Sequence, residues 1–100
     1  MSTSGIEVYT PLALGVSVTA DSLTVDLTDG RTLSVPLAWY PRLNHATASE
    51  RAAWNLTGGG RGIHWLGLDE DISVEGLLAG RRSQESPSSL ARWLAARGTR

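Results

Sequence analysis

An alternation of apolar and polar residues runs from Val16 to Leu37 and restricts the fold more than any other feature of the chain. The apolar positions are Val16, Val18, Leu23, Val25, Leu27, Leu33, Val35 and Leu37. Successive side chains of a β-strand point to opposite faces, so this period of two predicts strands with one buried and one solvated face. Asp29-Gly30 predicts a type I′ hairpin turn, because glycine adopts positive φ freely. We expect an antiparallel meander over about 14–37, whose third strand lies at an edge or ends at Pro36, which has no backbone donor.

The period changes after this meander, in the stretch that leads to three consecutive glycines. Thr47 and Glu50 have the spacing of a capping box, in which each side chain satisfies the other residue's free backbone N–H. A short helix over about 48–54 is therefore predicted. The glycines at 58–60 are interpreted as the end of that helix and a flexible turn. A phosphate-binding loop would need a flanking strand, a helix start and a lysine, and the sequence shows none of these there.

The second half of the chain predicts one further strand and two helices. The segment GIHWL is compatible with a fourth strand over about 62–66. Ser73 is placed to cap a short helix in VEGLLAG, and Ser86 followed by Pro87 begins a last helix over 87–97. The predicted fold class is therefore α+β, with a small antiparallel β-meander sheet, short helices and a C-terminal helix.

Length and composition indicate one small soluble domain. One hundred residues, 41% of them hydrophobic, can hold one modest core. No apolar run approaches the ~20 residues of a membrane span, and the opening MSTSGIEVYT does not look like a signal sequence. There is no cysteine for a disulfide or a thiolate site. We expect a cytoplasmic protein with an α+β domain over 1–80, followed over 81–100 by a polar loop and an amphipathic helix.

Charge is distributed unevenly along the chain, although the net charge is only −1. Residues 61–80 hold four acids and one arginine, a net of −3, whereas residues 81–100 hold five arginines and one glutamate, a net of +4. Arg92 and Arg97 could contact phosphate, but a single helix is not a helix-turn-helix, and the net charge gives no general nucleic-acid signal. Accessory DNA binding is kept as an alternative, and nucleic acid is not expected except through a partner.

The segment GIHWLGLDEDIS holds the residues best suited to chemistry, namely His64, Asp69, Glu70 and Asp71. Imidazole and carboxylate groups can hold Zn, Mn or Fe, and paired carboxylates can act as acid and base. In an extended chain, however, Asp69 and Asp71 point to one face and Glu70 to the other, and no simple local geometry brings His64 to them. The alternative interpretation is structural, because acids just before a helix start complement its dipole. A metal-dependent enzyme remains an alternative hypothesis, and no catalytic residue, cofactor or metal is assigned.

Four tryptophans, at positions 39, 54, 65 and 93, are many for a chain of this length. Tryptophan and arginine are enriched in interface hot spots, and a domain of this size has little room to bury all four. Leu90, Trp93 and Leu94 share a face of the last helix, which either closes this domain's own sheet or docks on a second protein or a second copy. We favour the docking surface, with Arg92 and Arg97 at its rim. The residues predicted to bind a partner are His64, Trp65, Asp69, Glu70, Asp71, Arg92, Trp93 and Arg97.

The stretches DGRTLSVPLAWYPRL and ATASERAAWNLTGGGRGIHWLGLDEDISVEGLLAG resemble the bacterial domain-of-unknown-function family DUF2442. The resemblance spans roughly residues 14–80, and its most specific piece runs from Gly62 through Trp65 to Ser73. Leu66 stands where a proline is expected after the tryptophan.

The resemblance implies a small α+β domain with an antiparallel sheet and short helices. Some members of the family are fused to a helix-turn-helix domain, and many are encoded beside another small protein, in pairs suspected of being toxin–antitoxin modules. It implies no enzymatic residues. We therefore predict a non-catalytic protein-interaction module, the antitoxin-like or regulatory partner in a bacterial two-gene module. Its partner would be another protein, encoded nearby, or a second copy of the chain.

Overall fold

The computed structural model describes residues 10–98, and its first sheet is the predicted meander. Strands β2 (Ala13–Val18), β3 (Ser22–Leu27) and β4 (Thr32–Pro36) are antiparallel and lie in the order β2-β3-β4. The third strand is at an edge and ends at its proline, as expected. Buried side chains alternate along β3, where Leu23, Val25 and Leu27 are almost fully enclosed.

The turn between β3 and β4 is where the sequence places it, but its type differs from the prediction. The amide of Gly30 donates to the carbonyl of Leu27 at 3.1 Å. Gly30 has a φ of 91°, but the φ of Asp29 is not positive, as a type I′ turn would require. This geometry is a type I turn followed by a left-handed glycine, the usual form of a three-residue hairpin loop. The Asp29 carboxylate accepts from the backbone N–H of Arg31 at 3.0 Å, which favours this longer loop.

A second antiparallel meander, which the sequence predicted only in its central strand, packs against the first. It consists of β5 (Trp54–Thr57), β6 (Gly62–Trp65) and β7 (Glu70–Ser73), in the order β5-β6-β7. The predicted helix over 48–54 is wrong at its end. Helix α2 covers Ala48–Ala52, and Trp54 instead begins β5, because it pairs across the sheet with Trp65.

The three glycines therefore close a β-hairpin rather than a helix. Gly58, Gly59 and Gly60 all have positive φ, at 58°, 68° and 106°. Gly60 is buried, and its carbonyl accepts from the amide of Ala13 at 2.7 Å. A Cβ on Gly60 would lie 2.8 Å from the Ala13 carbonyl oxygen. Position 60 requires glycine, because the first residue of β2 lies too close to leave room for a side chain. The hydrogen bond between Ala13 and Gly60 joins the two sheets.

Short helices connect the strands, and α2, α3 and α4 begin where the sequence predicts a helix start. The capping box of Thr47 and Glu50 is present at the start of α2, and the hydroxyl of Ser73 accepts from Gly76 N at the start of α3 (Val74–Leu78). The remaining connections are η1 (Leu37–Trp39), α1 (Pro41–Asn44) and η2 (Leu66–Leu68). Helix α4 (Pro87–Gly98) begins after Ser86, whose hydroxyl accepts from Ser89 N at 3.1 Å.

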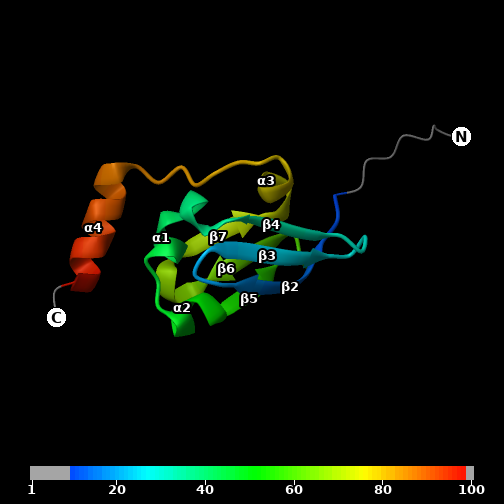
Figure 1. The fold of residues 1–100 in the computed structure, drawn as a ribbon, viewed down its shortest axis with the longest axis horizontal. Helices are drawn as coiled ribbons and strands as arrows, with labels where there is room; N and C mark the ends of the chain where they lie inside the picture. Colours follow the sequence, from blue (N-terminus) through cyan, green and yellow to red (C-terminus); the bar gives the residue numbers. More distant parts are fainter. Residues whose placement is uncertain (1–9, 99–100) are drawn as a thin grey trace, which may run out of the picture.

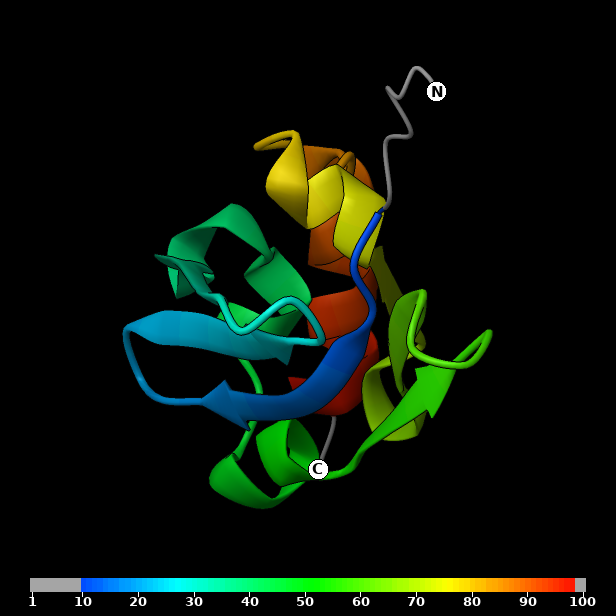
Figure 2. The ribbon, with the colours of Figure 1, turned by 90° about the vertical axis from the view of Figure 1, so that its right-hand side faces the viewer.

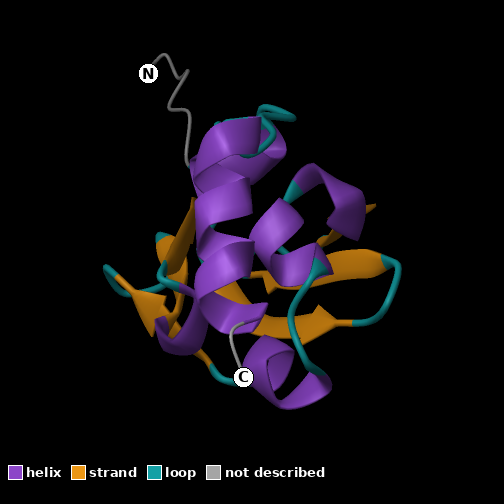
Figure 3. Ribbon diagram, turned by 90° about the vertical axis from the view of Figure 1, so that its left-hand side faces the viewer, coloured by secondary structure: helices purple, strands orange, loops and turns teal. Residues whose placement is uncertain are grey.

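One core lies between the two sheets, which Figure 1 shows one in front of the other and Figure 2 from the side. Its buried side chains come from both sheets and from the connections, and they are Ala13, Leu23, Val25, Leu27, Val35, Leu37, Tyr40, Leu43, Ile63, Trp65, Leu68, Ile72, Val74 and Leu77. Helix α4 crosses the end of the molecule at which α1 and α2 lie (Figures 1 and 3). The fold is therefore α+β, with two small sheets. Within residues 10–98, no helix is long and apolar enough to cross a membrane.

Candidate functional site

The β6–β7 hairpin brings His64 and Asp71 together, which local sequence spacing did not suggest. The two residues are directly opposite across the antiparallel pair, and His64 Nδ1 lies 2.8 Å from Asp71 Oδ1. Ile63 and Trp65 are fully buried while His64 lies on the other face of β6, as the alternation predicted. The pair lies at the surface, because the Asp71 side chain is 72% exposed.

The three acids lie shortly before α3, as the sequence places them, but the cap and the first-turn acid of that helix are Ser73 and Glu75. Asp69 caps η2 in a left-handed conformation with a φ of 51°, and Glu70 and Asp71 begin strand β7. The helix that follows starts only after Ser73. Asp69 and Asp71 are exposed, whereas Glu70 is half-buried. The acids are therefore carried by a turn and a strand, and they differ in how far solvent reaches them.

The fold strongly changes the ionisation of Glu70. Burial raises the pKa of its carboxyl to about 7, with smaller raising contributions from Glu85, Asp71 and Asp69. Arg42 acts in the opposite direction through its charge. The guanidinium of Arg42, however, is bound to both carboxylate oxygens of Glu85, at 2.6 and 3.0 Å. Glu70 is therefore a partly desolvated acid, and Arg42, whose charge acts on it, is held by another carboxylate.

An open hollow of about 320 Å³, here called the β7 edge groove, lies beside Glu70. One wall is strand β7, and the other is the connection between α3 and α4. Its lining residues are Tyr40, Glu70, Asp71, Ile72, Ser73, Gly76, Arg81, Arg82, Ser83 and Gln84. Because β7 pairs only with β6 among the described strands, the groove runs along an unpaired sheet edge.

The second wall of the groove is held in place by specific contacts. The amide of Ser83 donates to the Trp39 carbonyl at 3.0 Å, and the Tyr40 hydroxyl donates to the Arg81 carbonyl at 2.8 Å. The guanidinium of Arg82 stacks over the Trp39 ring at 4.6 Å from its centre. The connection was predicted only as a polar loop. The sequence gives no signal for this wall, because its residues meet β7 and η1 only through tertiary packing.

Helix α4 contacts its own domain through Trp93, whereas Leu90 and Leu94 of the predicted apolar stripe are only half-buried. Trp93 is partly buried and packs against the core. Two guanidinium groups lie over its ring, those of Arg97 at 4.4 Å and Arg42 at 5.3 Å from the ring centre. Arg97 is consequently a docking residue of this chain, whereas Arg92 is exposed.

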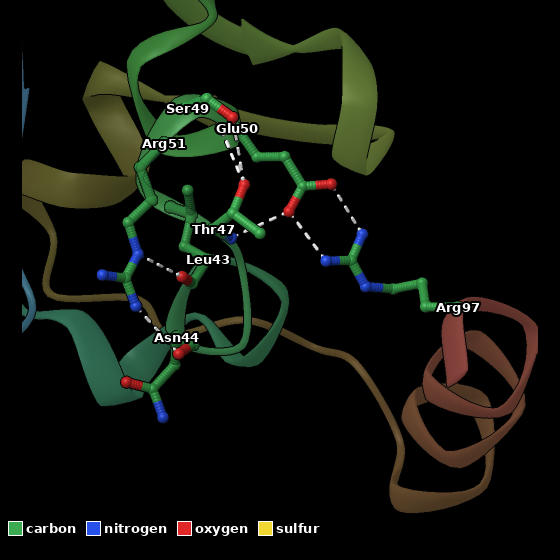
Figure 4. A network of polar contacts seen from close by, with 7 residues as sticks. All are labelled: Leu43, Asn44, Thr47, Ser49, Glu50, Arg51 and Arg97. Carbon is green, nitrogen blue, oxygen red and sulfur yellow. Dashed lines mark hydrogen bonds and ion pairs between the residues drawn. The ribbon is translucent and has the colours of Figure 1, made fainter. Parts of the chain in front are cut away.

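A bidentate ion pair fixes the end of α4 to the start of α2, as Figure 4 shows. Arg97 donates to both carboxylate oxygens of Glu50, at 2.7 and 2.8 Å, while Glu50 also accepts from the backbone N–H of Thr47 at 2.8 Å. The hydrogen bonds from Arg97 and from the Thr47 backbone lower the pKa of Glu50 to about 2. Glu50 of the capping box thus also anchors α4, a contact that the spacing of Thr47 and Glu50 does not reveal.

Trp65, predicted as a partner-binding residue, belongs to the core. Its side chain is fully buried, and its indole N–H donates to the Arg51 carbonyl at 3.0 Å. Of the predicted partner-binding residues, the structure gathers His64, Asp69, Glu70 and Asp71 at one hairpin. Trp93 and Arg97 instead hold α4 to its own domain.

The hairpin gathers few side chains that could hold a metal ion. His64 meets Asp71 alone among the three acids, and residues 10–98 contain no group of three or more His, Asp or Glu side chains placed to hold a metal ion. What the hairpin does offer is an unpaired strand, charged side chains and an apolar tip, since Leu66 is 75% exposed. These are the components of a binding surface.

Comparison with solved structures shows the same fold in two bacterial proteins. A protein of unknown function from Rhodospirillum rubrum has 29% sequence identity and a TM-score of 0.64, over 80% of this chain and 96% of that one. An uncharacterized protein from Chromobacterium violaceum has 24% identity and a TM-score of 0.63, over 87% of this chain and 76% of that one. No curated protein matches the chain at a significant level.

The match to a sequence family covers most of the chain. Residues 13–83, which include both sheets, α3 and the second wall of the groove as far as Ser83, match the family described as "Protein of unknown function (DUF2442)". Helix α4 lies beyond the matched region. The most specific piece of the resemblance, from Gly62 to Ser73, forms the β6–β7 hairpin itself. The chain belongs to the DUF2442 family.

Proposed function

We propose that this protein is a non-catalytic protein-interaction module whose binding surface is the β6–β7 hairpin and the β7 edge groove beside it. The observation that carries the proposal is an unpaired strand edge lying open along a hollow of about 320 Å³. An exposed sheet edge is a template for pairing with another chain, and proteins commonly protect such edges. Here the edge is flanked by charged groups and a pocket, an arrangement that suits a specific partner.

The tip of the same hairpin supports this proposal. Leu66 exposes 75% of its surface, and Asp69 next to it is exposed in a left-handed turn. An apolar anchor supplies buried area, while surrounding charges steer the approach of a partner and set its orientation. The acids at 69–71 favour a partner with a basic surface.

The partner is proposed to be another bacterial protein, encoded nearby, for which this chain is an antitoxin-like or regulatory subunit. Accordingly, purified protein from the native host should carry a stoichiometric partner. The test uses two double variants with matched changes. Leu66→Ser with Asp69→Asn alters the hairpin tip. Leu14→Ser with Asp21→Asn alters a leucine of β2 that is 63% exposed and an exposed aspartate in the turn between β2 and β3.

We expect the wild-type protein and the first-sheet variant to co-purify with the same partner, and the tip variant to lose it by at least tenfold. Calorimetry with the purified partner then gives the stoichiometry and the change in Kd. Equal retention by both variants would refute the proposed surface. Elemental analysis covers the enzyme alternative: stoichiometric zinc, manganese or iron that disappears in His64→Ala would overturn a non-catalytic role.

A further inference from the structure

In the antiparallel pair of β6 and β7, hydrogen-bonded residue pairs alternate with non-hydrogen-bonded pairs. This alternation determines which main-chain groups of β7 face the groove. Just beyond the ladder, Val74 N donates to the Arg61 carbonyl at 2.9 Å, so Arg61 and Val74 form a hydrogen-bonded pair. In antiparallel sheets such pairs alternate with pairs whose N–H and C=O groups point away from each other. Ser73 and Asp71 therefore occupy the outward-pointing positions.

The contact between the His64 and Asp71 side chains agrees with this assignment of outward-pointing residues. Residues of an outward-pointing pair have closer Cα atoms, at ~4.5 Å, which brings their side chains together. His64 and Asp71 form such a pair, and their side chains approach to 2.8 Å. The N–H groups of Asp71 and Ser73 and the carbonyl of Asp71 consequently face the edge groove, where no described strand pairs with them.

The charge of the groove differs between its two walls. Glu70 and Asp71 line one wall and Arg81 and Arg82 the other, but Arg82 is stacked on Trp39. On β7 the side chains of Glu70 and Ile72 share one face, and Ile72 is buried. Glu70 therefore lies at the inner, partly desolvated side of the groove. The attraction between its carboxylate and an added cationic side chain is strongest there, because less water screens the two charges.

We propose that the β7 edge groove binds an extended segment of a partner protein as an added β-strand, with a lysine or arginine of that segment opposite Glu70. This inference rests on the proposed function and specifies how its surface works. Main-chain hydrogen bonds to Asp71 and Ser73 hold the segment, and side chains on alternate positions give specificity, as in other cases of strand addition. An opposite-charge pair across neighbouring strands adds to the stability of the pairing.

The length of β7 limits the size of the added strand. Four residues at ~3.3 Å each span about 13 Å, so the partner contributes a short segment of similar length. Few main-chain bonds can form over this distance. The added strand is therefore one part of a larger interface that also uses the Leu66 tip, and an isolated peptide is expected to bind weakly and be in fast exchange.

The test uses a defined peptide rather than the natural partner. The probe is a blocked seven-residue peptide of alternating threonine and valine with a central lysine, and the matched probe carries glutamate in place of the lysine. Titration of the full isotope-labelled chain, followed by amide NMR, should shift the Asp71 and Ser73 amides most. The glutamate peptide should bind at least tenfold more weakly, a difference of ~1.4 kcal/mol.

Two pairs of variants separate the main-chain and charge contributions. Asp71→Pro removes an outward N–H without removing a ladder bond to β6, and Asp71→Ala is its control, since both lose the contact with His64. The proline variant should bind the lysine peptide at least tenfold more weakly than the alanine variant. If the proline variant does not fold, Glu70→Gln decides, because it should abolish the preference for lysine over glutamate.

Three results would overturn the inference. Peptide-induced shifts could map to another edge such as β5, or the Glu70→Gln protein could retain the full lysine preference. The Asp71 and Ser73 amides could also exchange slowly with solvent in the free protein, which would mean that another part of the chain already covers the edge. Loss of the natural partner in the tip variant together with any of these results would leave the proposed function standing and refute only strand addition.

Discussion

Replacing Glu70 with glutamine should stabilise the protein in a pH-dependent manner. The carboxyl is half-buried beside Tyr40 in the β7 edge groove, and burial raises its pKa from 4.5 to about 7. A raised pKa means that the folded state favours the protonated form. Ionised Glu70 therefore destabilises the fold, whereas glutamine keeps a similar shape without the charge.

The sign and size of the effect follow from linkage. Below pH 4.5 Glu70 is protonated in both the folded and unfolded states, so it contributes no pH-dependent destabilisation. Between pH 4.5 and 7 the unfolded state loses its proton first, and the destabilisation grows with pH. At full strength this pKa change corresponds to roughly 3 kcal/mol, and partial solvent exposure reduces it. We expect Glu70→Gln to be more stable than wild type by about 1–3 kcal/mol at pH 8 and by little at pH 4.

Urea unfolding of both proteins at several pH values, followed by tryptophan fluorescence, measures this difference. Glu75→Gln is the control, because Glu75 is an exposed acid on α3 and the substitution changes the net charge by the same amount. The difference for Glu70→Gln should rise between pH 4.5 and 7 and then level off. A difference that is constant with pH, or that is reproduced by Glu75→Gln, would refute the reasoning.

Three further predictions concern packing and the docking of α4. Gly60→Ala should destabilise the fold by more than about 2 kcal/mol in denaturant unfolding, because its Cβ would lie 2.8 Å from a carbonyl oxygen. Gly59→Ala, which also has positive φ but open space, should cost ~1 kcal/mol, and equal effects would contradict the close-approach argument. Trp93→Ala should lower the free energy of unfolding by about 2 kcal/mol in a dilute monomer, since the ring is half-buried on the core, whereas unchanged monomer stability would indicate an intermolecular role. Arg97→Gln should destabilise the protein at pH 7 by up to ~1 kcal/mol, because it removes the ion pair with Glu50. In thermal melts this difference in stability should fade between pH 4.5 and 2, where Glu50 becomes protonated. A difference that does not depend on pH would count against the ion pair.

The β5 strand shows why local pattern was insufficient near the second sheet. Trp54 and Leu56 alternate with polar residues, but the strand has only four residues and follows a clear helix start. So short an alternation cannot be distinguished from the end of a helix by period alone. What makes it a strand is the pairing of Trp54 with Trp65 and of Leu56 with Ile63, which are partners seven or more residues away.

By itself, the sequence determined the features that depend on neighbouring residues. The first meander follows from its period of two, and the starts of α2, α3 and α4 follow from side chains that bond to amides three residues away. Only the tertiary structure decided that His64 meets Asp71, that Arg97 meets Glu50 across 47 positions, and that the polar connection forms a wall beside β7. These contacts depend on strand register and on how the core brings distant segments together, and no local spacing encodes either.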